Sequence, residues 1–170
     1  MKTSLTAIAL GVTIVGAAAT ANVASATRDS DGALLTDVRA ATARYHSPAQ
    51  AEEAGYVQAS PCEIDPDGAG GMGYHYVNPT LLEDPEIDPL RPEILLYAPR
   101  SNGTLELVGV EYLTFDADGR FDTPSFGSVA FDGPMPGHGG DMPVHYDLHV
   151  WLYEDNPSGM YATWNPDVTC

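Results

Sequence analysis

The sequence is nearly free of lysine: Lys2 is the only one among 170 residues. Schiff-base catalysis needs a lysine amine, and a phosphate-binding P-loop needs the lysine of a GxxxxGK run. The chain has no GxxxxGK run, no GxSxG nucleophile elbow, and no GxGxxG run that follows a predicted strand. These absences argue against covalent catalysis by lysine or serine and against nucleotide binding.

Positive charge is scarce throughout, since six arginines and Lys2 face 24 acidic residues and give a formal net charge of −17. Such a charge repels nucleic acid and anionic lipid, and it concentrates cations around the protein. We therefore expect no DNA or RNA partner. Solubility or a salty environment is the alternative explanation of the acidity.

Long apolar runs are missing beyond the N-terminus. The run from Leu5 to Ala21 follows the positive Lys2 and precedes Ala24-Ser25-Ala26, which fits a signal-peptidase site. We predict a signal peptide over residues 1–26 and a single globular domain over 27–170, in a secreted or extracytoplasmic protein. An uncleaved membrane anchor is the alternative for the first segment, and no later run is long enough to span a bilayer.

Cysteine is scarce too, with only Cys62 and Cys170. In an exported protein two cysteines predict one intramolecular disulfide bond. A loop of about 109 residues closed in this way would stabilise the fold by roughly 4 to 5 kcal/mol if chain entropy dominates. Free thiols and an intermolecular bridge are the alternatives, and the spacing excludes a CxxC redox motif.

Helical patterns are confined to the N-terminal part of the domain. Apolar residues recur at helical spacing over residues 30–44, where Ser30 or Asp31 could cap the helix. The run Ser47-Pro48-Ala49-Gln50 has a capping serine and a proline at the first helical position, so a second short helix is predicted to end at Gly55.

From Cys62 onward, strand and turn patterns prevail. The apolar runs 94–97 and 105–115 flank Asn102-Gly103, which suits a tight hairpin turn. Together with the helices they predict an α+β domain, in which two short N-terminal helices pack on an antiparallel β-barrel or sandwich.

The segment from Val144 to Tyr153 alternates strictly between apolar and other side chains, as in a strand with one face in the core. His145, Asp147 and His149 share the other face. The two histidines have the HxxxH spacing of helical metal motifs, but on a strand their Cα atoms stand about 13 Å apart. That distance is too long for one ion, so further ligands must come from other strands.

Two side chains on other predicted strands are candidates. His75 lies in the short aromatic run 72–77, directly after Gly70-Gly71, which permits close backbone approach. In the run 105–115, strand alternation predicts that Glu111 lies on the same face as apolar residues. An isolated carboxylate is costly to bury on such a face. A metal ion or a histidine would compensate Glu111, and an ion pair with an arginine is the alternative. The arginines considered are Arg91, Arg100 and Arg120.

These candidates form a His/carboxylate set of the kind that binds zinc, copper, iron or manganese. The predicted metal ligands are His75, Glu111, His145, Asp147 and His149. A set without cysteine argues against a purely structural zinc site, and hydrogen-bonded core histidines are the alternative. Met135, His138, Met142 and His145 form a second pattern of thioether and imidazole donors that suits Cu(I), although the glycine-rich loop around His138 could be a plain turn.

Several runs of the sequence resemble those of an uncharacterised family of exported bacterial proteins to which no activity is attached. They are Gly73-Tyr74-His75-Tyr76, His145 to Trp151, Asn156-Pro157-Ser158-Gly159 and Asn165-Pro166. The resemblance implies only that these runs belong to one architecture. A cupin barrel was considered as well, but its HxH(x)3,4E spacing is absent.

Two hypotheses of function follow. The first is an exported metal-binding protein or metalloenzyme, with its site on the polar face of the last long strand. The second is a non-catalytic β-barrel module that binds a small apolar or aromatic ligand. The aromatic side chains that would line its pocket are Tyr74, Tyr76, Trp151, Tyr153 and Trp164.

Overall fold

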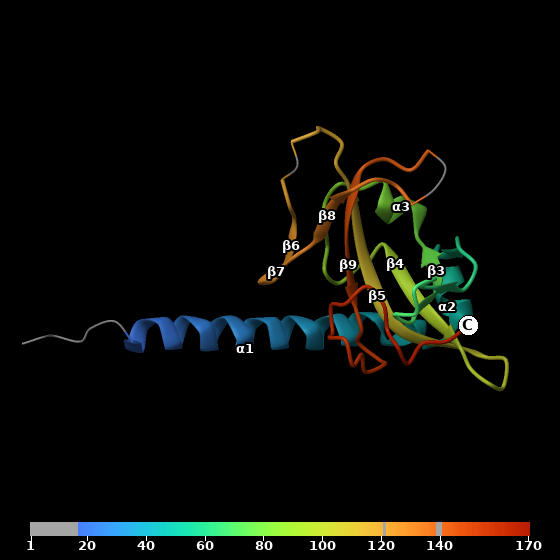
Figure 1. Cartoon of the computed structure of the whole chain (residues 1–170), viewed down its shortest axis with the longest axis horizontal. Coiled ribbons are helices and arrows are strands. Elements are labelled where there is room, and N and C mark those ends of the chain that lie inside the picture. The colour runs from blue at the N-terminus through green and yellow to red at the C-terminus, as the bar shows by residue number, and fades with distance from the viewer. Residues whose placement is uncertain (1–16, 121, 139–140) are drawn as a thin grey trace, which may run out of the picture.

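The computed structural model describes residues 17–120, 122–138 and 141–170 and has an α+β fold (Figure 1). One main helix lies along the side of a twisted antiparallel sheet and extends beyond it at its N-terminal end. Most of the predicted signal peptide, residues 1–16, lies outside the described residues. None of the helices in the described ranges is both long enough and apolar enough to cross a lipid bilayer.

The N-terminal segment forms one long helix, α1 (Ala17–Thr42), which begins well before the predicted start at residue 30. A single 3-10 turn, η1 (Ala43–His46), and the six-residue α2 (Pro48–Glu53) follow it. The prediction of two short helices is therefore not confirmed, because the chain continues as helix through the expected cap. The side chain of Ser47 makes no capping hydrogen bond, although Pro48 does open α2.

Seven strands form the main sheet in the order β1-β3-β4-β5-β9-β8, and β2 also pairs with β3. The strands are β1 (Val57–Gln58), β2 (Glu63–Ile64), β3 (Gly71–Val77), β4 (Ile94–Pro99), β5 (Leu105–Phe115), β8 (Asp132–Met135) and β9 (His145–Val150). Among the described residues β1 and β8 do not pair with each other, so the sheet is open; of the two predicted architectures, a barrel or a sandwich, the barrel is wrong. A short helix, α3 (Pro79–Leu82), connects β3 to the segment before β4.

A separate hairpin of β6 (Ser125–Phe126) and β7 (Val129–Ala130) lies beside α1. Asp31, a predicted helix cap, instead accepts hydrogen bonds from the backbone N–H of Ser128 at 3.2 Å and from its hydroxyl. The carboxylate therefore ties the helix to this hairpin.

The hairpin of β4 and β5 turns at Asn102-Gly103 as predicted, with Gly103 at a φ of +81°. Its register shifts at a bulge, since Leu96 pairs with Gly109 while the next residue, Tyr97, pairs with Leu107. The bulge changes which side chains share a face: Glu111 lies on the face of Leu113, whereas Leu107 packs on the opposite one.

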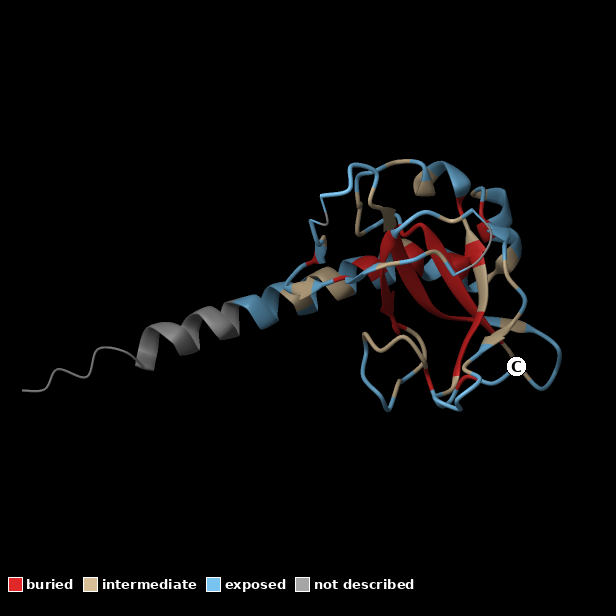
Figure 2. Cartoon of the chain, turned by 45° about the horizontal axis from the view of Figure 1, so that its top comes forward, coloured by how far each residue is buried: buried red, intermediate tan, exposed pale blue. Residues whose placement is uncertain are grey.

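The two faces of the sheet bury different side chains, and buried residues concentrate in the central strands (Figure 2). The face toward the helices holds a core rich in tyrosine and leucine, into which Val38 of α1, Tyr45 of η1 and Ala51 of α2 pack. The opposite face holds a smaller apolar cluster that includes Ile94, Leu96, Leu113 and Trp151. The candidate ligands lie on this second face.

The Cys62–Cys170 disulfide bond is present, with Cα atoms 5.7 Å apart, which confirms the predicted pairing. It holds the end of the chain beside β2. The segment just before Cys170 lies against the start of β3, where Gly71 and Asn165 exchange two backbone hydrogen bonds of 3.0 Å. Any Cβ on Gly70 would collide with the backbone of Asn165, so this close approach requires glycine.

Candidate metal centre

Three strands bring His75, Glu111 and His149 together on the face away from the helices. Glu111 of β5 lies directly opposite His149 of β9 in the register, and His75 of β3 reaches them across β4. The alternation of β9 places His149 on this face, because its neighbours Leu148 and Val150 belong to the core on the other side.

The donor atoms of these three residues converge on one point. Glu111 Oε2 lies 3.3 Å from His75 Nε2 and 3.7 Å from His149 Nε2, and one donor atom of each residue lies within 4.8 Å of the others. Two ligands bound tetrahedrally at about 2.0–2.1 Å from zinc stand roughly 3.3–3.4 Å apart. The separation of Glu111 Oε2 from His75 Nε2 has this length, and that from His149 Nε2 is longer by a few tenths of an ångström.

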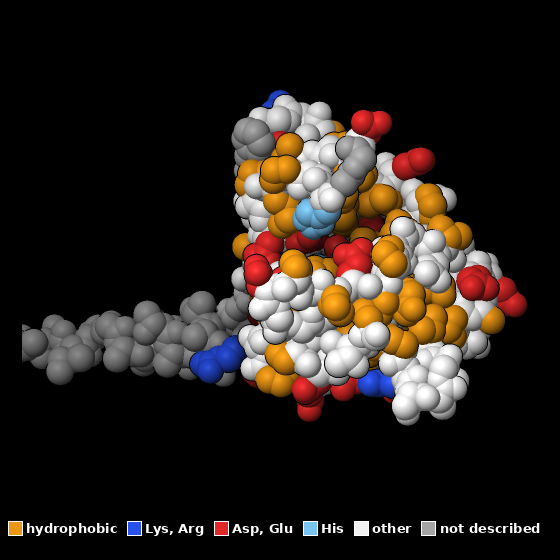
Figure 3. All heavy atoms as spheres, turned by 45° about the vertical axis from the view of Figure 1, so that its right-hand side comes forward, with side chains coloured by type: hydrophobic (Ala, Val, Ile, Leu, Met, Phe, Trp, Pro, Cys, Tyr) orange, Lys and Arg blue, Asp and Glu red, His pale blue; other side chains and the backbone are white. Residues whose placement is uncertain are grey.

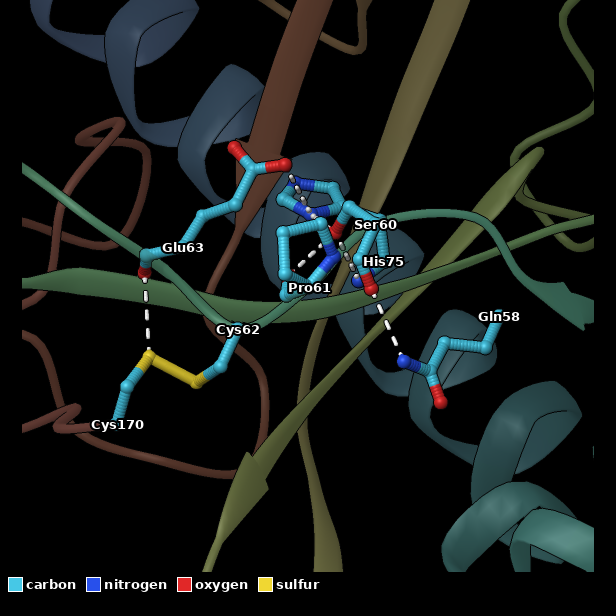
Figure 4. Close-up of a disulfide and its surroundings, with 7 residues drawn as sticks. All are labelled: Gln58, Ser60, Pro61, Cys62, Glu63, His75 and Cys170. Atoms are coloured by element: carbon cyan, nitrogen blue, oxygen red, sulfur yellow. Dashed lines mark hydrogen bonds and ion pairs between the residues drawn. A yellow bond between two sulfur atoms is a disulfide. The ribbon is translucent and has the colours of Figure 1, made fainter.

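A hydrogen-bond chain orients the ring of His75 (Figure 4). Its Nδ1 lies 3.0 Å from the hydroxyl oxygen of Ser60, and that hydroxyl donates its own proton to the Pro61 carbonyl at 2.8 Å. The Ser60 oxygen must then accept from Nδ1–H, which assigns the lone pair to Nε2, the atom that faces Glu111. The carboxylate of Glu63 lies 3.8 Å from the same Nδ1. Metal-binding histidines are commonly oriented in this way by a partner on the second nitrogen.

Burial isolates these donors from water. The side chain of His75 is 12 % exposed, that of Glu111 5 % and that of His149 2 %. Neither ring nitrogen of His149 has a hydrogen-bond partner among the described residues, and the same holds for Glu111 Oε2. Buried polar atoms are usually paired, because an unpaired one costs about 1–3 kcal/mol. Glu111 Oε2 and His149 Nε2, two of the three converging donor atoms, are therefore buried at such a cost.

The environment sets the protonation of the three groups. Burial lowers the pKa of His149 to about 3, and nearby His75 and His138 add to the effect. Burial likewise lowers the pKa of His75, against the pull of Glu63. Both rings are neutral at physiological pH, which is the form that binds metal. Burial, reinforced by Asp147, raises the pKa of Glu111 well above its usual range, so this carboxyl is protonated unless a cation compensates its charge.

The remaining two predicted ligands lie in a second cluster. His145 Nε2 is 3.9 Å from Asp147 Oδ2, and His138 completes a group whose donor atoms lie within 4.8 Å of one another. The structure thus separates His145 from His149, as their spacing on one strand requires. It joins His145 to His138. Both histidines belong to the second predicted pattern, that of thioether and imidazole donors, and His138 was not among the predicted ligands of the first.

Both clusters face shared space. A cavity of about 190 Å³ is lined by His75, Glu111 and His149 together with His138 and Asp147. An adjoining cavity of about 380 Å³ shares Glu63, Met72, His138 and Asp147 with it and adds Met135, Thr163 and Trp164. Figure 3 shows a histidine and acidic side chains exposed together at a hollow that hydrophobic side chains surround.

The arginine alternative for Glu111 is wrong. Arg91 pairs with Asp88, Arg120 with Asp118, and Arg100 with Glu106 and Glu154, all away from the cluster.

The five aromatic candidates do not line one pocket. Tyr74, Tyr76 and Tyr153 pack with the core on the helix side, and Trp151 belongs to the smaller cluster on the other face. Of the five, only Trp164 lines a cavity beside the candidate ligands.

Sequence reasoning missed Ser60 and Glu63, which orient His75. Both lie in a polar segment without periodicity. Ser60 follows β1 and Glu63 belongs to β2, and the pairing of these two strands with β3 brings both residues to the site. The adjacent Cys62 was the one available signal, since a disulfide there had to fix this segment.

Comparison with known proteins finds no matching family model, no similar curated protein and no similar solved structure. The resemblance to a family of exported bacterial proteins stays a prediction.

Proposed function

We propose that the protein binds a transition-metal ion through His75 Nε2, Glu111 and His149 Nε2. The observation that carries this proposal is the convergence of three donor atoms, two of which, Glu111 Oε2 and His149 Nε2, are buried without a hydrogen-bond partner among the described residues. A shared proton between Glu111 and a histidine is the competing explanation, because the raised pKa of Glu111 would keep it protonated without a cation.

We propose further that this is a metalloenzyme site rather than a structural one. Two histidines and one glutamate match the donor sets of catalytic zinc and of non-haem iron, which leave coordination positions open. The open side here faces the cavity of about 190 Å³. A metal in such a site polarises a substrate oxygen or lowers the pKa of bound water. The adjoining cavity with Trp164 is large enough to hold the rest of a small substrate.

A non-catalytic binding module is the second candidate. The observation in its favour is the same adjoining cavity of about 380 Å³, lined by Met72, Met135 and Trp164. Its ligand would be a small apolar or aromatic molecule, and no metal would be needed.

For either function we propose that the protein is exported. The Cys62–Cys170 bond supports this, because stable disulfides form in oxidising compartments.

Metal analysis of the purified protein tests the proposal. Elemental analysis before and after chelation, followed by Zn²⁺ titration, is expected to find an ion that His75→Ala and His149→Ala each lose while circular dichroism shows a retained fold. His46→Ala is the matched control, because His46 is exposed and packs on Tyr153 outside both clusters. Full metal content in both histidine variants would contradict the ligand set.

Glu111→Gln separates a metal ligand from a buried neutral acid. The substitution keeps the shape and removes the charge, so a ligand role predicts weaker Zn²⁺ binding and a proton-sharing role predicts little change. If Glu111→Gln binds Zn²⁺ like the parent while His75→Ala does not, the site lacks Glu111.

A further inference from the structure

The second cluster has features of a metal site in its own right. His145 and Asp147 alternate along β9, and Met135 of β8 lies directly opposite His145 in the register. His138 follows β8 closely in sequence, and its ring packs on His145 with centroids 4.9 Å apart. Four potential donors from two paired strands and one loop thus gather at the edge of the sheet.

The ring of His145 is oriented for binding. Its Nδ1 lies 3.2 Å from the Pro143 carbonyl oxygen, which can only accept a hydrogen bond, so Nδ1 carries the proton. The lone pair is therefore on Nε2, which is fully buried and has no hydrogen-bond partner among the described residues. This nitrogen faces Asp147, just as His75 Nε2 faces Glu111.

A sulfur donor distinguishes this cluster from the first. Met135 Sδ lies 3.3 Å from His138 Nε2 and can only accept a hydrogen bond from it, so the two side chains are already in contact without an ion. Thioether sulfur is a soft ligand that favours copper, whereas the first cluster offers only nitrogen and oxygen donors.

We propose that His138, His145, Asp147 and Met135 bind a second transition-metal ion, and that this ion is copper. The two ions would lie on neighbouring positions of one sheet face, because Asp147 and His149 are alternate residues of β9 with Cα atoms about 6.6 Å apart. Asp147 and His138 line the cavity of the first cluster, so both ions would act on one bound molecule. The second site uses none of the three ligands of the proposed first site, so its binding can be tested separately.

Copper titration of the full chain tests this inference. Zn²⁺ is loaded first, and Cu(I), kept reduced with ascorbate, is then competed against a chromophoric Cu(I) chelator. The parent protein is expected to bind one copper ion beside one zinc ion. His138→Ala, at an exposed position, is expected to weaken copper binding at least about tenfold, the cost of a lost interaction of about 1.4 kcal/mol, and to leave zinc binding unchanged.

Met135→Leu isolates the role of the sulfur. It keeps the size and apolar character of the side chain, so a weaker affinity for Cu(I) with an unchanged affinity for Zn²⁺ supports the proposal. Met160→Leu, at an exposed methionine outside the cluster, is the control. Equal copper binding in the parent and in His138→Ala overturns the second site. Equal Cu(I) affinity in the parent and in Met135→Leu overturns the assignment to copper.

These outcomes are distinct from failure of the first site. A protein whose single ion is lost in His149→Ala and kept in His138→Ala has the proposed function without the second ion. A protein that binds copper through His138 but binds no zinc has the second site without the proposed first site.

Discussion

The two faces of the central sheet are buried to a similar degree but satisfy their polar groups differently. On the helix side three tyrosine hydroxyls donate to backbone carbonyls: Tyr56 to Pro92 at 2.7 Å, Tyr97 to Tyr45 at 2.5 Å and Tyr112 to Pro89 at 2.6 Å. Tyr146 is the exception, since its hydroxyl has at most a marginal hydrogen bond with the side chain of Thr123. On the other face, nitrogens of His145 and His149 and an oxygen of Glu111 are unpaired.

The difference shows that burial alone does not identify a functional face. The same strands supply both, because alternate residues of β5 and β9 point to opposite sides. What distinguishes the second face is the combination of deep burial, neutral histidines and unpaired donors. The helix side is built for stability, whereas the other face bears a cost in stability that a bound cation would offset.

Truncation of the helix-side core should have the largest effect on folding. Tyr97→Ala removes a fully buried ring and a hydrogen bond to Tyr45, so we expect the free energy of unfolding to fall by about 3–5 kcal/mol. Urea denaturation of the metal-free protein measures it. A loss below about 1 kcal/mol would mean that this face is not the main core.

A buried acid on the helix side should make stability depend on pH. Glu93 is 1 % exposed and accepts a hydrogen bond from the Leu113 N–H at 3.2 Å, yet burial raises its pKa to about 7. As the pH rises from about 4.5 through 7, the unfolded chain releases this proton before the folded one, so the contribution of Glu93 to stability falls by about 3 kcal/mol.

Glu93→Gln tests the pH effect, since it removes the titration and keeps an acceptor for Leu113. The difference in unfolding free energy between parent and variant, measured from pH 4 to 8, isolates Glu93 from the other acids. A difference that does not change with pH would contradict the assignment.

On the site face, loss of a polar group should stabilise the metal-free protein. Glu111→Leu replaces an unpaired buried carboxyl by an apolar side chain among Ile94 and Leu113, so we expect a gain of about 1–2 kcal/mol. Thermal or urea unfolding in the presence of a chelator measures the gain. Glu86→Leu, at an exposed loop position, should stay within about 0.5 kcal/mol of the parent.

The same kind of change on the helix side should have the opposite sign. Tyr97→Phe removes only the hydroxyl and leaves the Tyr45 carbonyl without its partner, so we expect a loss of about 1 kcal/mol. If Tyr97→Phe stabilised the protein as Glu111→Leu does, the contrast between the two faces would not hold.

Local patterns in the sequence predicted much of the sheet. The run 105–115 is the observed β5, the Asn102-Gly103 turn is in place, and the alternation after Val144 puts His145, Asp147 and His149 on one face. These features depend on neighbouring residues, which is why the sequence alone reveals them.

Features that depend on contacts between distant segments were not predictable. The bulge at Val108 of β5 moves Leu107 away from the face of Glu111, against a simple alternation over the whole strand. The pairing of β1 and β2 with β3 brings Ser60 and Glu63 to His75, and the partition of the ligands into two clusters depends on strand order. Alternation shows which side chains share a face but not which strands are neighbours.

The disulfide bond also closes the chain between Cys62 and Cys170 into a covalent ring. Every residue of both clusters lies between Cys62 and Cys170, within a closed ring, whereas α1 and α2 lie outside it on a tail. After one proteolytic cut anywhere inside the ring, the disulfide bond still joins the two fragments, which separate only after reduction. A cut between Gly55 and Cys62 detaches the helices from the ring, even under oxidising conditions. The part of the protein that bears the candidate ligands is thus the part that survives a single backbone break as one molecule.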